Sequence, residues 1–157
     1  MKRGFRYSRR ALALDYARSG VGAALCGGLL LLASPALAAG ALLAAAAALF
    51  LVYFTRTVCR QLTHIELDEA GIRARGPWGA EIRWENLRAM RLDYYSTRAD
   101  REEGWMQLRL RDARRTIRLD SDLEGFDELV RAVAEAASRR GLALDAASLS
   151  NLKALGA

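Results

Sequence analysis

Few side chains in this sequence are of types that perform chemistry, and they lie far apart. The chain has one histidine, His64, and two cysteines, Cys26 and Cys59. These residues do not have the ligand spacing of a zinc site. No nucleophile has a base beside it in the sequence, and no glycine-rich phosphate loop precedes a predicted helix. We therefore expect no catalytic residue, no metal ion and no cofactor, as in a non-enzymatic protein.

Arginine is the one charged side chain that recurs with a pattern. It occupies the outward positions of the strands predicted below, at Arg73, Arg75, Arg83, Arg91, Arg109, Arg111 and Arg118. Such a face could bind anionic lipid head groups or an acidic partner protein. Alternatively, it is a solvated face whose arginines pair across strands with Glu66, Glu81 and Asp93. Acidic residues nearly match the arginines in number, which favours the solvated face. The mixed-charge loop 96–104 could also serve recognition, or it is merely solvated.

Four aromatic residues form a second candidate group, namely Trp78, Tyr94, Tyr95 and Trp105. Trp78 follows Gly-Pro in a predicted turn, where a large ring gains little from a core. It could enter the membrane interface or anchor a partner, or it could fold back over the end of the sheet. Trp84 and Tyr94 fall on the inward side of their predicted strands, so we expect both in the core.

The element that locates the protein is the uncharged run from Ser19 to Thr55, which lies between Arg18 and Arg56. As one helix it would be about 55 Å long, against a hydrocarbon core of about 30 Å. Two crossings are therefore expected, with a turn at Ser34-Pro35. Serine is a favoured N-cap and proline is tolerated in the first helical turn, so the second helix should start there and end near Thr57. We predict a transmembrane helical hairpin over residues 12–57.

Small and charged residues complete the predicted hairpin. Asp15 and Arg18 are three residues apart on one helical face, where they can form an ion pair. The small residues of the first helix should allow close approach to residues 38–48 of the second. These small residues are Gly20, Gly22, Ala23, Gly27 and Gly28.

Basic residues flank the hairpin on both sides, and its turn has no charge. They are Lys2, Arg3, Arg6, Arg9, Arg10 and Arg18 before it, and Arg56 and Arg60 after it. By the positive-inside tendency, both termini of a multi-pass inner-membrane protein would then be cytoplasmic. The alternative is a signal peptide cleaved after Ala38. Cleavage there would leave the apolar run 41–54 at the new N-terminus, which argues against it.

The net charge of +6 is unevenly distributed. Residues 1–18 hold six basic and one acidic residue, whereas residues 61–140 hold 15 basic and 16 acidic residues. The basic excess thus lies beside the membrane segment, where it suits anionic lipid. The domain after the hairpin is neutral, which argues against a nucleic-acid partner.

After Leu62 the apolar residues recur with a period of two, which indicates short antiparallel strands with one apolar face. The inward residues of the six expected strands are Ile65 and Leu67; Ile72 and Ala74; Ile82 and Trp84; Met90, Leu92 and Tyr94; Met106, Leu108 and Leu110; and Ile117 and Leu119. We expect an α+β domain in which one meander curls over a core.

The period then changes to that of a helix. Asp120-Ser121-Asp122 offers an N-cap, and Gly141 is typical of a helix end. The apolar stripe that would cover the sheet is Leu123, Phe126, Leu129, Val130, Val133 and Ala137. A short second helix from Asp145 to about Leu155 is expected to pack weakly or fray.

This order of elements resembles the small bacterial membrane proteins that join a transmembrane hairpin to a bacterial pleckstrin-homology-like domain. The resemblance covers roughly residues 12–141, with its pattern around Gly71-Ile72-Arg73, Trp84-Glu85-Asn86-Leu87 and Phe126. It implies a curled sheet of six or seven strands capped by one C-terminal helix, used for binding and scaffolding. Eukaryotic relatives bind phosphoinositides through basic residues near the first hairpin loop. Here that loop, residues 68–71, is acidic.

The expected organisation is a basic N-terminus (1–18), the hairpin (12–57), a pleckstrin-homology-like domain (61–141) and a short C-terminal helix or tail (142–157). The favoured hypothesis is a membrane protein that presents this domain to a protein partner or to a second copy of itself. One alternative is an anionic-lipid sensor. The other is an accessory subunit of a larger membrane complex, docked through the glycines of its first helix.

Overall fold

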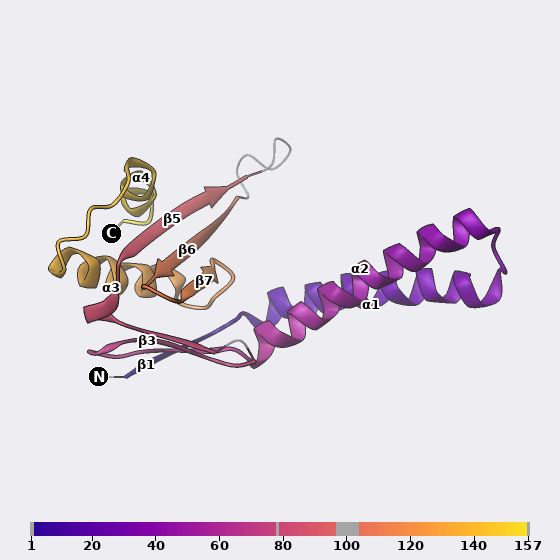
Figure 1. Ribbon diagram of the computed structural model, residues 1–157, viewed down its shortest axis with the longest axis horizontal. Helices are drawn as coiled ribbons and strands as arrows, with labels where there is room; N and C mark the ends of the chain where they lie inside the picture. The colour runs from indigo at the N-terminus through magenta and orange to yellow at the C-terminus, as the bar shows by residue number, and fades with distance from the viewer. Residues whose placement is uncertain (1, 78, 97–103, 157) are drawn as a thin grey trace. The chain divides into compact units, whose positions relative to one another are not determined.

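The computed structural model describes residues 2–77, 79–96 and 104–156, which form two compact units (Figure 1). One unit is the helical hairpin from Ser8 to Leu62. The other combines the chain up to Tyr7 with the chain from Thr63 onward. The described residues thus form an α-helical hairpin and an α+β domain, as the sequence predicts at this level.

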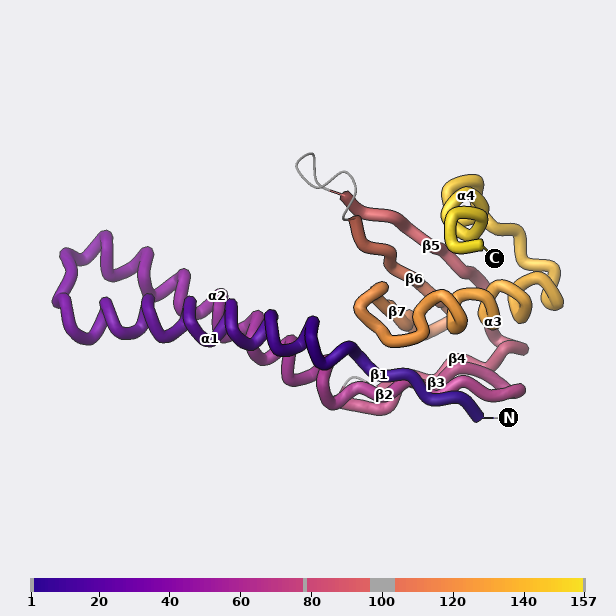
Figure 2. The backbone as a smooth tube through the Cα atoms, turned by 180° about the vertical axis from the view of Figure 1, so that it is seen from behind, coloured from indigo at the N-terminus to yellow at the C-terminus, as the bar shows by residue number. Residues whose placement is uncertain are grey.

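The hairpin consists of α1 (Arg9–Leu32) and α2 (Leu37–Leu62), which run antiparallel and side by side (Figures 1 and 2). The turn lies where it is predicted, but Ser34 adopts a left-handed φ of 40° and α2 begins only at Leu37. Of the glycines in α1, Gly22 makes the close approach. A Cβ atom there would lie 2.4 Å from the ring of Phe50. Gly22 therefore fits the expectation of close helix packing.

The second helix is longer than predicted, because polar residues near its end have partners within the hairpin. Thr57 is 1% exposed, and its hydroxyl donates to the carbonyl of Tyr53 at 3.0 Å. The Tyr16 hydroxyl donates to the side chain of Gln61. The helix therefore continues past the predicted end at Thr57 and stops at Leu62.

The α+β unit has two antiparallel sheets where the sequence predicts one. The first sheet is β1 (Arg3–Arg6), β2 (His64–Leu67), β3 (Gly71–Arg75) and β4 (Ala80–Arg83). The second is β5 (Ala89–Tyr95), β6 (Trp105–Arg111) and β7 (Thr116–Asp120). Between them, η1 (Trp84–Asn86) ends the first sheet. Trp84, predicted to be an inward strand residue, lies in this turn and is only half-buried, and its indole donates to the carbonyl of Asp68.

The strand β1 is absent from the prediction. It pairs with β2, placing Phe5 opposite Ile65 and Arg6 opposite His64. Phe5 is 6% exposed. Because it is the only apolar residue of β1, the sequence shows no alternating pattern from which this strand could be predicted. The predicted domain range 61–141 therefore lacks an edge strand that lies before the hairpin in the sequence.

The core lies between the two sheets and α3 (Phe126–Arg139). Its most deeply buried apolar side chains include Ile65, Ile72, Ile82, Leu92, Leu108, Leu110, Leu119, Leu129, Val130 and Val133. Most of the predicted inward strand residues and the predicted helical stripe thus meet in one core, whereas Trp84 and Tyr94 do not reach it. Burial of such side chains supplies the main favourable term in folding.

The helix α3 starts later than predicted. Its N-cap is Gly125, with a φ of 74°, a conformation that glycine adopts without a Cβ penalty. Residues just before it belong to a strand-like closure, because Leu123 forms a bridge with Tyr7 and the Glu124 N–H donates to the Arg6 carbonyl. Asp120–Asp122 therefore cannot be the N-cap.

The last helix, α4 (Ala146–Ala154), packs firmly against the free edge of β5, so the expectation of weak packing is wrong (Figure 2). The Leu92 N–H donates to the Ser148 hydroxyl at 2.9 Å. The Asn151 side-chain amide donates to the Leu92 carbonyl at 2.8 Å. Two side chains thus satisfy edge groups that a neighbouring strand would otherwise pair. Ser148 is fully buried as a result.

Candidate binding faces of the two sheets

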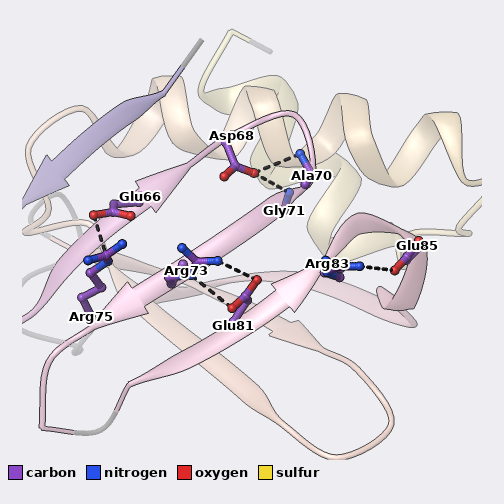
Figure 3. Close-up of polar contacts among 9 residues, drawn as sticks. All are labelled: Glu66, Asp68, Ala70, Gly71, Arg73, Arg75, Glu81, Arg83 and Glu85. Atoms are coloured by element: carbon purple, nitrogen blue, oxygen red, sulfur yellow. Dashed lines mark hydrogen bonds and ion pairs between the residues drawn. The ribbon is translucent and has the colours of Figure 1, made fainter.

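Each of the three predicted arginines of the first sheet, Arg73, Arg75 and Arg83, is paired with a carboxylate, as Figure 3 shows. The nitrogen–oxygen distances are 2.9 Å for Arg73–Glu81, 3.0 Å for Arg75–Glu66 and 3.1 Å for Arg83–Glu85. Arg73 binds Glu81 through two hydrogen bonds, and this contact lowers the pKa of Glu81 while raising that of Arg73. This half of the predicted arginine face therefore follows the solvated, charge-matched alternative.

The arginines of the second sheet are arranged differently. The strand register places Arg91 opposite Arg109, and Arg109 opposite Arg118, so three like charges form one row. Like charges directly opposite each other on a sheet are destabilising. Asp93 relieves part of the row, lying 2.8 Å from Arg91 and 3.9 Å from Arg109. Asp145 lies 3.5 Å from Arg91.

The other two predicted arginines of this sheet have no carboxylate close enough to form an ion pair within the described residues. Arg118 and Arg111 are exposed, and neither has an ion-pair partner in the part of the chain that the structure describes. Arg111 occupies the next row along the sheet, between Ala89 and Thr116. The seven predicted arginines are therefore split between two sheets, and only those of the second sheet leave positive charge uncompensated.

An aromatic pair lies at the other end of the same face. Tyr95 and Trp105 are register partners whose rings stack at 4.7 Å between centroids with 23° between planes. They remain 39% and 44% exposed. Tyr94, predicted to be in the core, is 43% exposed, because it lies near the end of β5. Trp78 and loop residues 97–103 are outside the described residues.

Together these rows form what we term the Arg–aromatic face, defined by Tyr95, Trp105, Arg91, Arg109, Arg111 and Arg118. Between its aromatic and arginine rows lie Asp93, Gln107 and Asp120. The Gln107 amide donates to Asp120 at 3.0 Å. The face thus presents stacked rings, a polar strip and a cationic row in that order.

The predicted membrane-flanking basic residues have several different positions. Lys2 precedes β1, and Arg3 and Arg6 are in β1, where Arg3 forms an ion pair with Glu128. Arg9, Arg10 and Arg18 are exposed in α1, and Arg56 is exposed in α2. Arg60 instead binds Asp15 at 3.1 Å. The predicted Asp15–Arg18 pair is therefore replaced by a pair between the two helices.

One helix in the described part of the chain, Leu37–Leu62, is long and apolar enough to cross a bilayer. The uncharged part of α1 runs only from Ser19 to Leu32, about 21 Å at the rise of an α-helix. Neither Cys26 nor Cys59 forms a disulfide bond within the described residues. No group of three or more His, Cys, Asp or Glu side chains able to hold a metal ion occurs among the residues described.

Comparisons with models of known protein families, with curated proteins and with solved structures find no match to this chain. The pleckstrin-homology-like resemblance therefore stays a prediction from the sequence.

Proposed function

We propose that this chain is a non-enzymatic membrane protein in which the hairpin anchors a protein-binding domain, and that the Arg–aromatic face is its docking surface. The main observation in support is that the stacked, exposed pair Tyr95–Trp105 lies on the same sheet face as Arg111 and Arg118, whose charges are not paired among the described residues. Tyrosine, tryptophan and arginine are the residues that dominate binding energy at protein interfaces. A partner surface with carboxylates opposite the arginine row would relieve its like-charge repulsion.

The surface of the hairpin supports its placement in a bilayer. Leu31, Leu32 and Leu37 are 85%, 88% and 93% exposed, which would be unfavourable in water and is ordinary in lipid. We extend the proposal to two crossings, with both termini cytoplasmic as the basic flanks suggest. Charged residues at the start of α1 are compatible with this because Asp15 is paired within the hairpin, which lowers the cost of placing it near the membrane.

The arrangement of strands supports a pleckstrin-homology-like assignment of the α+β unit. Its sheets contain four and three strands, and a helix follows the last strand. In this proposal the hairpin occupies the connection between the first and second strands. A domain of this class would act as a scaffold rather than as a catalyst, in agreement with the absence of a predicted catalytic group.

Charge pairing favours a protein partner over a lipid head group. The first hairpin loop of the sheet carries Asp68 and Glu69, and the arginines of β3 and β4 are neutralised by carboxylates. Arginine binds phosphate through charge-assisted hydrogen bonds, and the arginines of β3 and β4 already make such bonds with carboxylates. The exposed rings at one end of the Arg–aromatic face offer instead an apolar patch of the kind found in the core of protein interfaces.

Pull-down of the full chain from detergent-solubilised native membranes tests this proposal. We expect R111A/R118A to lose a co-purifying protein that the unchanged chain retains. The matched control is R73A/R75A, which also removes two arginines, but from the paired sheet, and should retain the protein. Equal recovery with both double variants would contradict the proposal. The lipid-sensing alternative makes a different prediction. It would be favoured if the full chain bound anionic vesicles in a salt-sensitive manner and only R111A/R118A weakened this binding.

A second candidate function, an accessory subunit of a larger membrane complex, is favoured by one observation in α1. A Cβ atom added at Gly20, Gly27 or Gly28 would meet no atom within 4 Å. These positions are therefore not used for packing inside the hairpin and would allow another helix to approach. G27L/G28L should then dissociate the chain from its complex on native gels, whereas R111A/R118A should not.

A further inference from the structure

A cleft in the α+β unit is lined by four arginines, none of which belongs to the Arg–aromatic face. Its volume is about 530 Å³. Arg88 follows η1, Arg114 and Arg115 are in the turn between β6 and β7, and Arg140 ends α3. Three segments far apart in the sequence thus bring guanidinium groups to one concave site, and the size is that of a small-molecule pocket.

The carboxylates of this cleft are already engaged elsewhere. Glu81 and Glu85 are held by Arg73 and Arg83, as Figure 3 shows. Asp112 accepts hydrogen bonds from the backbone N–H groups of Arg114 and Arg115, each at 2.6 Å. These contacts occupy the three acidic groups without using the side chains of the four lining arginines.

The lining arginines keep their donors free for a ligand. Arg140 donates one hydrogen bond to the Glu85 carbonyl at 2.6 Å, which fixes its head group and leaves its remaining N–H groups available. The side chains of Arg88, Arg114 and Arg115 have no partner within the described ranges of the chain. The charges of Arg115 and Arg88 help to lower the pKa of Asp112, after its backbone hydrogen bonds, so both act on the same turn.

We propose that this cleft binds a small phosphorylated molecule, with Arg88, Arg114 and Arg115 contacting its phosphate groups and Arg140 closing one side. Arginine presents a planar set of donors that matches phosphate oxygens in pairs, which makes it suited to such recognition. The cleft volume exceeds what one phosphate group needs and leaves space for a second group or an organic part. The ligand could be soluble or a phosphorylated head group of the bilayer, because both offer the same chemistry.

Calorimetric titration of inorganic pyrophosphate into the full chain, held in phosphatidylcholine nanodiscs at an ionic strength of about 0.15 M, tests this inference. The unchanged chain should bind, and R114A/R115A should bind at least about tenfold more weakly because two charge-assisted contacts are lost. The control is R6A/R131A, which removes the same charge from two exposed positions of the α+β unit that neither line the cleft nor belong to the Arg–aromatic face. It should change the affinity by less than about twofold, since its arginines lie outside the cleft.

The outcomes separate a built site from general electrostatic attraction. Equal weakening by both double variants, or no pyrophosphate binding by the unchanged chain, would overturn the inference. Discs that contain phosphatidic acid identify the source of the ligand. If this lipid competes with pyrophosphate in the unchanged chain but not in R114A/R115A, the cleft takes a head group. If the affinity is the same in both kinds of disc, the cleft takes a soluble ligand.

Discussion

Arg60 of α2 donates a hydrogen bond to Asp15 of α1, with Nη1 3.1 Å from Oδ2. The other carboxylate oxygen accepts from the Tyr53 hydroxyl at 2.6 Å. The Asp15 and Arg60 side chains are only 12% and 15% exposed. A mostly buried charge on one helix is therefore satisfied by two groups of the other, which fixes how the two helices pair.

This pairing predicts a large effect of removing one partner. R60A leaves the Asp15 carboxylate without its counter-charge and should lower the free energy of unfolding by about 3–5 kcal/mol. Equilibrium unfolding of the full chain in detergent micelles, followed by circular dichroism, measures it. R56A removes an exposed arginine one turn earlier and should cost less than about 1 kcal/mol. If D15L/R60L is as unstable as R60A, the ion pair is not the cause.

A second prediction concerns the strand β1. Because Arg6 lies opposite His64 in the register, joining Tyr7 to Thr63 through about two to five turn residues should close a hairpin and give a folded domain without α1 and α2. A fragment that starts at Thr63 lacks Phe5, which is 6% exposed. Loss of a buried aromatic side chain costs about 3–5 kcal/mol. Thermal unfolding of the two proteins compares them, and equal stability would mean that β1 contributes nothing.

Much of the α+β unit can be predicted from apolar periodicity. The features that cannot be predicted in this way have one cause in common. Ile65, Leu92 and Val133 are buried as their patterns predict. In contrast, β1 and the Asp15–Arg60 pair join segments separated by the hairpin or by a turn, and no local pattern encodes such pairing. The late start of α3 has the same origin, since Leu123 is held by Tyr7.

For the candidate site, the sequence likewise predicts which residues are exposed but not which of them lie together. The sequence identifies the outward arginines but not their division between two sheets, because both sheets alternate with the same period of two. The arginines that remain unpaired, Arg111 and Arg118, differ from Arg73 only in what lies across the strand. Cross-strand partners depend on register, which single-strand patterns do not specify.

The edge contact of α4 gives a third prediction. S148A removes the hydroxyl that accepts from the Leu92 N–H and leaves a buried donor unsatisfied, at a cost of about 1–3 kcal/mol. S150A is the matched control, because Ser150 is exposed on the same helix and its replacement should be nearly neutral. Chemical denaturation gives the stability, and hydrogen exchange should show faster exchange at the Leu92 amide only in S148A. Equal effects of the two variants would rule out this role for Ser148.

The pH dependence of stability is a fourth prediction. Backbone N–H groups donate to Asp68, Asp112 and Asp145 and hold the pKa of each carboxyl below its ordinary value. A carboxyl with a lowered native pKa stabilises the fold above its unfolded pKa of about 3.9 and loses this contribution as the pH falls through the native pKa. Stability should therefore decline below about pH 4. In D68N/D112N/D145N the denaturation midpoint should fall less steeply as the pH is lowered. If it falls as steeply as in the unchanged chain, these three carboxyls are not the cause.

The most direct test of the proposed function is site-specific photo-crosslinking in intact cells, with a benzophenone amino acid at position 116 or, as a control, at position 83. Both positions are exposed, Thr116 in the row of Arg111 on the second sheet and Arg83 on the paired sheet. We predict a discrete protein adduct from position 116 that disappears when Trp105→Ala is added, and none from position 83. Adducts of equal yield from both positions, or none from position 116, would contradict the assignment of the Arg–aromatic face as a protein-docking surface.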